Sequence, residues 1–200
     1  MTQPIDFYFD FSSPYGYFMA EKIDVLAAAH GRSVRWRPFL LGAVYKHTGS
    51  RLMLDAPLKG PYVFRDFERT AAFYGLPWVL PQPFPVGTQV AARAFYWLLD
   101  RDEAMARRFA LETYRAYFAR GRDISQDEVV IDVAAAVGAD RAALVDALAG
   151  EAIRTRLKDE CARAIDKGVF GSPYVIVDGE PFWGADRIPQ IERWLEAGAF

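Results

Sequence analysis

The sequence has a single cysteine, Cys161, among its 200 residues. One thiol cannot form an internal disulfide or a two-cysteine redox motif, so dithiol oxidoreductase chemistry is excluded. Cys161 stands in a helical context, where we expect a small buried apolar group and not a nucleophile. Histidine is also scarce: the sequence has only His30 and His47. Neither has acidic or cysteine ligands near it along the chain. We therefore expect no metal site.

An excess of charge and long apolar runs are lacking as well. The formal net charge is −2 and acids and bases are interspersed, so no basic stripe follows a phosphate backbone and we expect no nucleic-acid partner. No apolar stretch is long enough to span a bilayer, and the first residues lack the basic and apolar regions of a leader. We expect a cytoplasmic protein with no membrane partner. At 52% hydrophobic residues, the chain can bury a core without disulfides or metal.

The order of predicted elements indicates the fold. Strands over 5–11 and 34–38 flank a helix over 14–29, and strands over 174–177 and 180–183, joined by a hairpin turn, precede a helix over 186–197. Six helices are predicted between these ends, over 62–74, 88–100, 104–119, 127–137, 141–149 and 152–168, with irregular loops over 42–61 and 77–85. This plan predicts an α/β, thioredoxin-like fold (βαβ … ββα) with a large inserted helical domain. Residues 1–41 and 169–200 form the thioredoxin-like domain, and residues 42–168 the helical insertion domain with the substrate loop.

The aromatic strand that begins the chain runs directly into Ser12-Ser13-Pro14-Tyr15. Ser13 is suited to the N-cap of a helix and Pro14 to its first position, where a missing N–H costs nothing. A helix N-terminus favours an anion, so Ser13 either only caps the helix or also places a hydroxyl beside a bound anion.

Two further segments fall at the same predicted edge of the sheet. Ser172-Pro173 precedes a strand, and a cis form of this bond, which is a hypothesis, would expose the backbone of Ser172 to an extended peptide-like ligand. The segment 183–187 begins the last helix, where Asp186 can cap the helix, bind an α-ammonium group, or do both. Together the three segments predict a cradle for a small peptide.

On these residues the chain resembles the 2-hydroxychromene-2-carboxylate isomerase family, relatives of kappa-class glutathione transferases in the DsbA-like thioredoxin superfamily. The resemblance spans nearly the whole chain and rests on the segments 10–15, 46–51, 59–60, 169–173 and 184–187. It implies a glutathione-dependent isomerase of naphthalene-type aromatic catabolism, with a small aromatic carboxylate as substrate and a homodimeric state. It also implies that a 2-hydroxychromene-2-carboxylate-type substrate is opened and isomerised to a trans-hydroxybenzylidenepyruvate-type product.

The resemblance also assigns the residues of the site. Ser13 becomes the catalytic serine, whose hydroxyl donates a hydrogen bond to the glutathione thiolate. The cofactor-binding residues are Ser13, Ser172, Pro173, Trp183, Gly184, Ala185, Asp186 and Lys59, and the substrate-binding residues are Lys46, Ser50, Arg51, Phe84 and Tyr15. Two of these depart from the family, because Ser50 replaces a common asparagine and Phe84 replaces a tyrosine that contacts substrate in the naphthalene-pathway enzyme.

Two other functions stay open at this point. A kappa-like glutathione transferase or peroxidase would share Ser13 and the tripeptide cradle but use different electrophiles. A non-catalytic peptide-binding module would add a peptide strand beside Pro173. The cations of the loop, together with Ser13 and Asp186, favour an enzyme over a generic peptide clamp.

Overall fold

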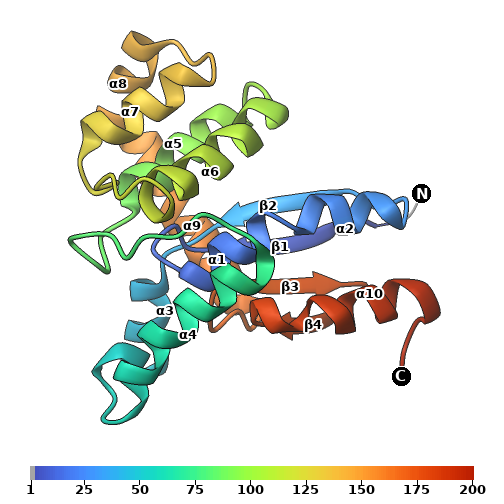
Figure 1. Cartoon of the computed structure of the whole chain (residues 1–200). Helices are drawn as coiled ribbons and strands as arrows, with labels where there is room; N and C mark the ends of the chain where they lie inside the picture. Colours follow the sequence, from blue (N-terminus) through green and yellow to red (C-terminus); the bar gives the residue numbers. More distant parts are fainter. Residues whose placement is uncertain (1–2) are drawn as a thin grey trace.

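The computed structural model describes residues 3–200 and places a four-stranded mixed sheet at the centre of the molecule (Figure 1). The strand order is β2-β1-β3-β4, with β1 Ile5–Phe9, β2 Val34–Pro38, β3 Tyr174–Val177 and β4 Glu180–Trp183. β1 pairs in parallel with β2, and the pairings of β1 with β3 and of β3 with β4 are antiparallel. The predicted thioredoxin-like order of strands and helices is confirmed.

Helices occupy most of the rest of the chain. Around the strands lie α1 Pro14–Ala20, α2 Ile23–Ala29, the short 3₁₀ segment η2 Ala185–Arg187 and α10 Ile188–Ala197. Between β2 and β3 the chain forms α3 Leu41–Thr48, the 3₁₀ segment η1 Met53–Asp55, α4 Lys59–Tyr74, α5 Gln89–Leu99, α6 Glu103–Phe118, α7 Asp127–Ala136, α8 Arg141–Ala149 and α9 Glu151–Asp166. Helices α4–α9 match the six predicted ones to within one helical turn at each end.

Figure 1 shows how the inserted helices divide in space. Helices α5–α8 gather beyond one end of the sheet, whereas α3, η1 and the start of α4 form an arm that points the other way. One continuous cluster of buried side chains still runs from the sheet into the helices: Phe9 of β1 contacts Phe95 of α5 and Tyr114 of α6. The division of the chain into two domains at residues 42 and 168 stays a prediction.

Three predicted boundaries are wrong, each for a local or tertiary reason. The first strand ends at Phe9, and not at residue 11, because the Asp10 side chain accepts a hydrogen bond from the N–H of Ser12 and turns the chain. The helix predicted over 14–29 is two helices, because the N–H of Lys22 bonds back to Met19 in a tighter turn. The loop predicted over 42–61 contains α3, whose first N–H, from Leu41, is satisfied by Asp10.

The predictions about Cys161 and about membrane-spanning segments can be compared with the fold. Cys161 is buried, and its sulfur accepts a weak hydrogen bond from the N–H of Leu40. Burial raises the pKa of this thiol, so the expected inert role is consistent with its surroundings. Within residues 3–200, no helix is both long and apolar enough to cross a membrane.

Candidate active site

Ser13 stands at the point where the first strand turns into α1. Its backbone is extended and its Oγ accepts a hydrogen bond of 3.1 Å from the N–H of Gly16, so it caps α1 as predicted. Pro14 occupies the first turn, and Ser13 itself is buried. The helix that it caps has only seven residues, fewer than the sequence suggested.

The hydroxyl of Ser13 reaches the segment before β3. Ser13 Oγ donates a hydrogen bond of 2.9 Å to the carbonyl oxygen of Ser172, across 159 positions of the chain. The Ser172–Pro173 bond is cis, as the sequence-based hypothesis supposed. In return, Ser172 Oγ accepts a hydrogen bond of 2.9 Å from the N–H of Asp10. Two of the three predicted segments of the cradle are therefore in direct contact.

The third segment joins them through β4. The N–H of Gly184 donates to the carbonyl oxygen of Pro173 at 3.1 Å, and Trp183 pairs with Tyr174 across the strands. Trp183 is 48% exposed and lies edge-on to Phe170, with 4.9 Å between ring centroids. A Cβ atom on Gly171 would lie 2.2 Å from the indole nitrogen of Trp183, so only glycine allows this packing. Ala185, the next residue after Gly184, is buried.

Asp186 does not cap the last helix. The chain forms η2 before α10, whose N-cap is Arg187 without a side-chain capping bond. The Asp186 side chain is 70% exposed, and within residues 3–200 its one ion pair is with Arg187, at 2.9 Å. The capping alternative is therefore wrong, and the Asp186 carboxylate is free to meet a ligand.

Tyr15 and Phe84 share one aromatic cluster. Both rings contact Phe67 of α4, with centroid distances of 5.2 and 6.1 Å. The hydroxyl of Tyr15 donates a hydrogen bond of 2.6 Å to Asp66 Oδ2, and burial together with this contact raises the pKa of Tyr15. Because Asp66 already engages that hydroxyl, Tyr15 can contact an aromatic substrate with its ring and not with its oxygen.

The four polar residues expected to bind carboxylates lie on the arm. Lys46 is in the last turn of α3, Ser50 and Arg51 follow that helix, and Lys59 begins α4; all four are exposed. In the part of the chain that the structure describes, the three cations take part in no ion pair, and no hydrogen bond joins them to Ser13 or Ser172. Ser50 accepts a hydrogen bond of 2.8 Å from Thr48. Their charge is thus available to an anionic ligand, but the structure does not bring them together with Ser13 directly.

Asp10 is the residue that the sequence analysis missed as a site component. Its buried carboxylate accepts hydrogen bonds from the N–H and hydroxyl of Ser12, the hydroxyl of Thr88 and the N–H of Leu41, at 2.7 to 2.9 Å. Burial raises the pKa of Asp10, and these donors oppose the rise. Asp10 thereby fastens the turn that carries Ser13 to both α3 and α5. Its place between a strand and a serine pair is the only sequence signal for this role.

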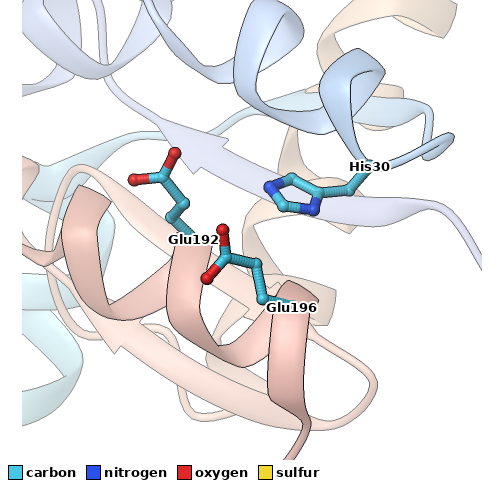
Figure 2. A group of neighbouring side chains, drawn as sticks. All are labelled: His30, Glu192 and Glu196. Atoms are coloured by element: carbon cyan, nitrogen blue, oxygen red, sulfur yellow. The ribbon is translucent and has the colours of Figure 1, made fainter.

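A separate group of titratable side chains lies between α2 and α10 (Figure 2). His30, at the C-terminal end of α2, and Glu192 and Glu196 of α10 offer ligand atoms within 4.8 Å of one another. The premise that His30 has no acidic neighbour holds along the chain but is wrong in the fold. All three side chains are exposed or half-exposed, without a further ligand in this group among residues 3–200. The absence of a metal site stays a prediction.

Comparison with known proteins places this geometry in a family. The model of the DSBA-like thioredoxin domain matches residues 4–196. A 2-hydroxychromene-2-carboxylate isomerase of Sphingobium xenophagum is 30% identical, over 98% of this chain and 99% of that protein. Glutathione S-transferase kappa 1 of Caenorhabditis elegans is 29% identical, over 96% of this chain and 90% of that protein.

A solved structure leads to the same result. The structure of a 2-hydroxychromene-2-carboxylate isomerase superposes with a TM-score of 0.88 at 28% sequence identity, covering 97% of this chain and 95% of that one. The match spans the sheet and the inserted helices alike. The chain therefore belongs to the DSBA-like thioredoxin domain family and, within it, to the group of 2-hydroxychromene-2-carboxylate isomerases and their kappa-class glutathione transferase relatives.

Proposed function

We propose that this protein is a glutathione-dependent isomerase of aromatic catabolism. It converts a 2-hydroxychromene-2-carboxylate-type substrate to a trans-hydroxybenzylidenepyruvate-type product. The observation that carries the proposal is the junction of Ser13 with Ser172, built into a chain whose relatives include isomerases of this name. The kappa-class relatives support glutathione as the cofactor, because the thiol it carries is what such a site would hold.

The residues of the cradle fit a tripeptide thiol. No hydrogen bond from the N–H of Ser172 is found within residues 3–200, and its carbonyl oxygen accepts only the Ser13 hydroxyl there, so both groups can pair with an extended backbone. The exposed Asp186 carboxylate suits an α-ammonium group, and Lys59 suits a carboxylate at the other end of the ligand. When bound, glutathione would supply the thiolate that adds to the pyran ring. The ring would then open, the former double bond would rotate, and the thiolate would leave without net redox change.

The proposal gives each residue of the candidate site a role. Ser13 donates its hydroxyl proton in a hydrogen bond to the thiolate, which favours the charged sulfur over the thiol. Tyr15 and Phe84 supply aromatic walls, and Lys46, Ser50 and Arg51 orient the substrate carboxylate.

The test is an assay of the purified protein on 2-hydroxychromene-2-carboxylate with and without glutathione, followed by the absorbance change of isomerisation. We expect conversion that requires glutathione and falls by about 10²–10³-fold in Ser13→Ala, the range seen when one stabilising donor is removed. Calorimetric titration with glutathione is run beside it. Absence of glutathione binding would overturn the proposal and leave the peptide-binding module, which is then tested with unstructured peptides.

A kappa-like transferase or peroxidase is the second candidate, and the 29% identity to a kappa enzyme favours it. Phe84 supports it as well, because this chain lacks the hydroxyl that the naphthalene-pathway enzyme directs at its substrate. Conjugation of a chloroaromatic electrophile or reduction of a peroxide, measured with the same protein, discriminates the two. Glutathione binding with transfer but without isomerisation would favour this candidate.

The proposal includes a homodimer. Helix α4 exposes Tyr62, Phe64 and Phe73, the last at 81%, and Leu58 beside its start is 90% exposed. Exposed apolar side chains in this density on one helix are typical of an interface. Sedimentation velocity of the wild type and of Phe73→Asp tests this, with a dimer expected for the first and a shift to monomer for the second.

A further inference from the structure

The single proton of the Ser13 hydroxyl is already in use. A serine hydroxyl can donate one hydrogen bond, and Ser13 Oγ donates it to the carbonyl oxygen of Ser172 at 2.9 Å while accepting from Gly16 at 3.1 Å. Ser13 therefore cannot donate to a thiolate until this bond is given up. A rotation about the Cβ–Oγ bond breaks the bond to Ser172 while the N–H of Gly16 still holds the oxygen.

Giving up that bond has a cost that depends on the ligand. Ser172 is buried, and within the described residues its carbonyl oxygen has no donor besides Ser13. When a bound thiol shields this carbonyl oxygen from water and offers it no donor, the unpaired oxygen disfavours the rotated state by about tenfold or more in population. A ligand that brings its own N–H to Ser172 removes this penalty, because the carbonyl exchanges one donor for another.

The position of Ser172 is rigid enough for this exchange to be selective. Its Oγ is tied to the N–H of Asp10 at 2.9 Å, and Pro173 after it is tied to Gly184. The carbonyl therefore cannot turn away to find another donor. The N–H of the same residue donates no hydrogen bond among the residues that the structure describes, so an extended backbone that donates to the carbonyl can also accept from this N–H.

We propose that the Ser13–Ser172 hydrogen bond restricts thiol activation to thiols carried on a backbone with an N–H group that can donate to Ser172. Binding of that N–H releases the Ser13 hydroxyl, which turns to the sulfur, and no proton is transferred. A thiol without the N–H can enter the site but leaves Ser13 paired with Ser172. This inference rests on the proposed function, and it adds the chemical class of thiol that the site activates.

The experiment compares three ligands on three proteins. The ligands are glutathione, its sulfur-free analogue with 2-aminobutyrate in place of cysteine, and an ester analogue in which oxygen replaces the cysteinyl N–H. The proteins are the wild type and Ser13→Gly, because glycine is well tolerated at an N-cap; Ser13→Ala serves as a second variant. Circular dichroism and thermal unfolding establish that the variants are folded.

The measured quantities are affinity by calorimetry and kcat/KM for addition of each thiol to a chromogenic electrophile. The rate constant is taken below saturation, so weak binding of the ester analogue is no obstacle. We expect Ser13→Gly to lower kcat/KM for glutathione by about tenfold or more, the effect of losing a charge-assisted hydrogen bond. For the ester analogue we expect a change of less than about twofold, and for the sulfur-free analogue an affinity within about twofold of the wild type.

The outcomes separate the inference from the proposed function. If Ser13→Gly lowers kcat/KM equally for glutathione and for the ester analogue, the inference is wrong and glutathione-dependent catalysis stands. If it weakens binding of the sulfur-free analogue as much as that of glutathione, Ser13 acts only as a cap, which also overturns the inference. If the wild type does not bind glutathione, the proposed function fails, and the inference fails with it.

Discussion

The hydroxyl of Thr88 donates a hydrogen bond of 2.9 Å to Oδ1 of Asp10, joining the N-cap of α5 to the turn that carries Ser13. The same oxygen accepts two bonds from Ser12, and Oδ2 accepts one from the N–H of Leu41 at 2.7 Å. One buried carboxylate thus fixes three separate segments around the candidate site. The geometry of the turn that carries Ser13 therefore depends on the Asp10 carboxylate.

Asp10→Asn tests this role. The asparagine amide keeps only one of the two acceptor oxygens. Its NH₂ group would face another donor, which is the N–H of Leu41 in one orientation and the donors of Ser12 and Thr88 in the other. We expect a loss of about 1–3 kcal/mol in the free energy of unfolding, the cost of an unsatisfied buried donor. Urea denaturation measures it, with Thr88→Val as the matched control that removes only one donor and costs less. An Asn variant as stable as the wild type would contradict the assignment.

Gly16 is required by the close approach of α1 to α6. A Cβ on Gly16 would lie 2.5 Å from the hydroxyl oxygen of Tyr114, which donates to the Asp10 carbonyl, and 3.1 Å from Ser172 Oγ. We expect Gly16→Ala to destabilise the protein by about 1–3 kcal/mol. Removing the clashing oxygen in Gly16→Ala/Tyr114→Phe should recover part of this loss, so the two changes are coupled. Additive costs in thermal unfolding would show that the clash is relieved elsewhere.

Asp186→Ala separates binding from stability. Because Asp186 caps no helix and its side chain is exposed, we expect the melting temperature to stay within the error of the measurement. Glutathione affinity should fall by about tenfold, the effect of losing one charge-assisted contact to the ligand. Calorimetry measures the affinity, and Arg187→Ala shows what loss of the neighbouring charge does by itself. Unchanged affinity in Asp186→Ala would remove Asp186 from the site.

The Asp178–Arg32 pair makes stability depend on pH. Arg32 donates two hydrogen bonds to the Asp178 carboxylate, at 2.7 and 3.0 Å, and these hold the pKa of Asp178 below its ordinary value. A carboxyl whose pKa is lower in the folded state stabilises the fold above its unfolded pKa, about 4, and loses this effect as the pH falls through the lower, folded pKa.

Asp178→Asn should therefore reduce stability at neutral pH and have less effect at acid pH. Asparagine tolerates the positive φ of residue 178, so the turn itself is kept. Thermal unfolding of both proteins between about pH 2 and pH 7 measures the difference, and it should narrow toward acid pH. A gap that is constant over this range would mean that the ion pair contributes nothing to the pH dependence.

The sequence by itself determined the elements that depend on local signals. The cap at Ser13, the proline after it, the Asp178-Gly179 turn and the apolar periodicity of the inserted helices act through neighbours along the chain, so they can be identified without a structure. Their order was enough to predict the thioredoxin-like fold. The motif residues of the resemblance then indicated the family that the comparisons show.

Only the tertiary structure decided which of these residues act together. The contacts of Ser13 with Ser172, of Asp10 with Thr88 and of Tyr15 with Asp66 join residues 159, 78 and 51 positions apart. Such pairs depend on the pairing of β1 with β3 and on the packing of helices against the sheet. Other long-range contacts start α3 at Leu41, through Asp10, and bring Glu192 to His30, where local sequence carries no signal. The free energy of these contacts comes from burial that only the assembled sheet and helices create.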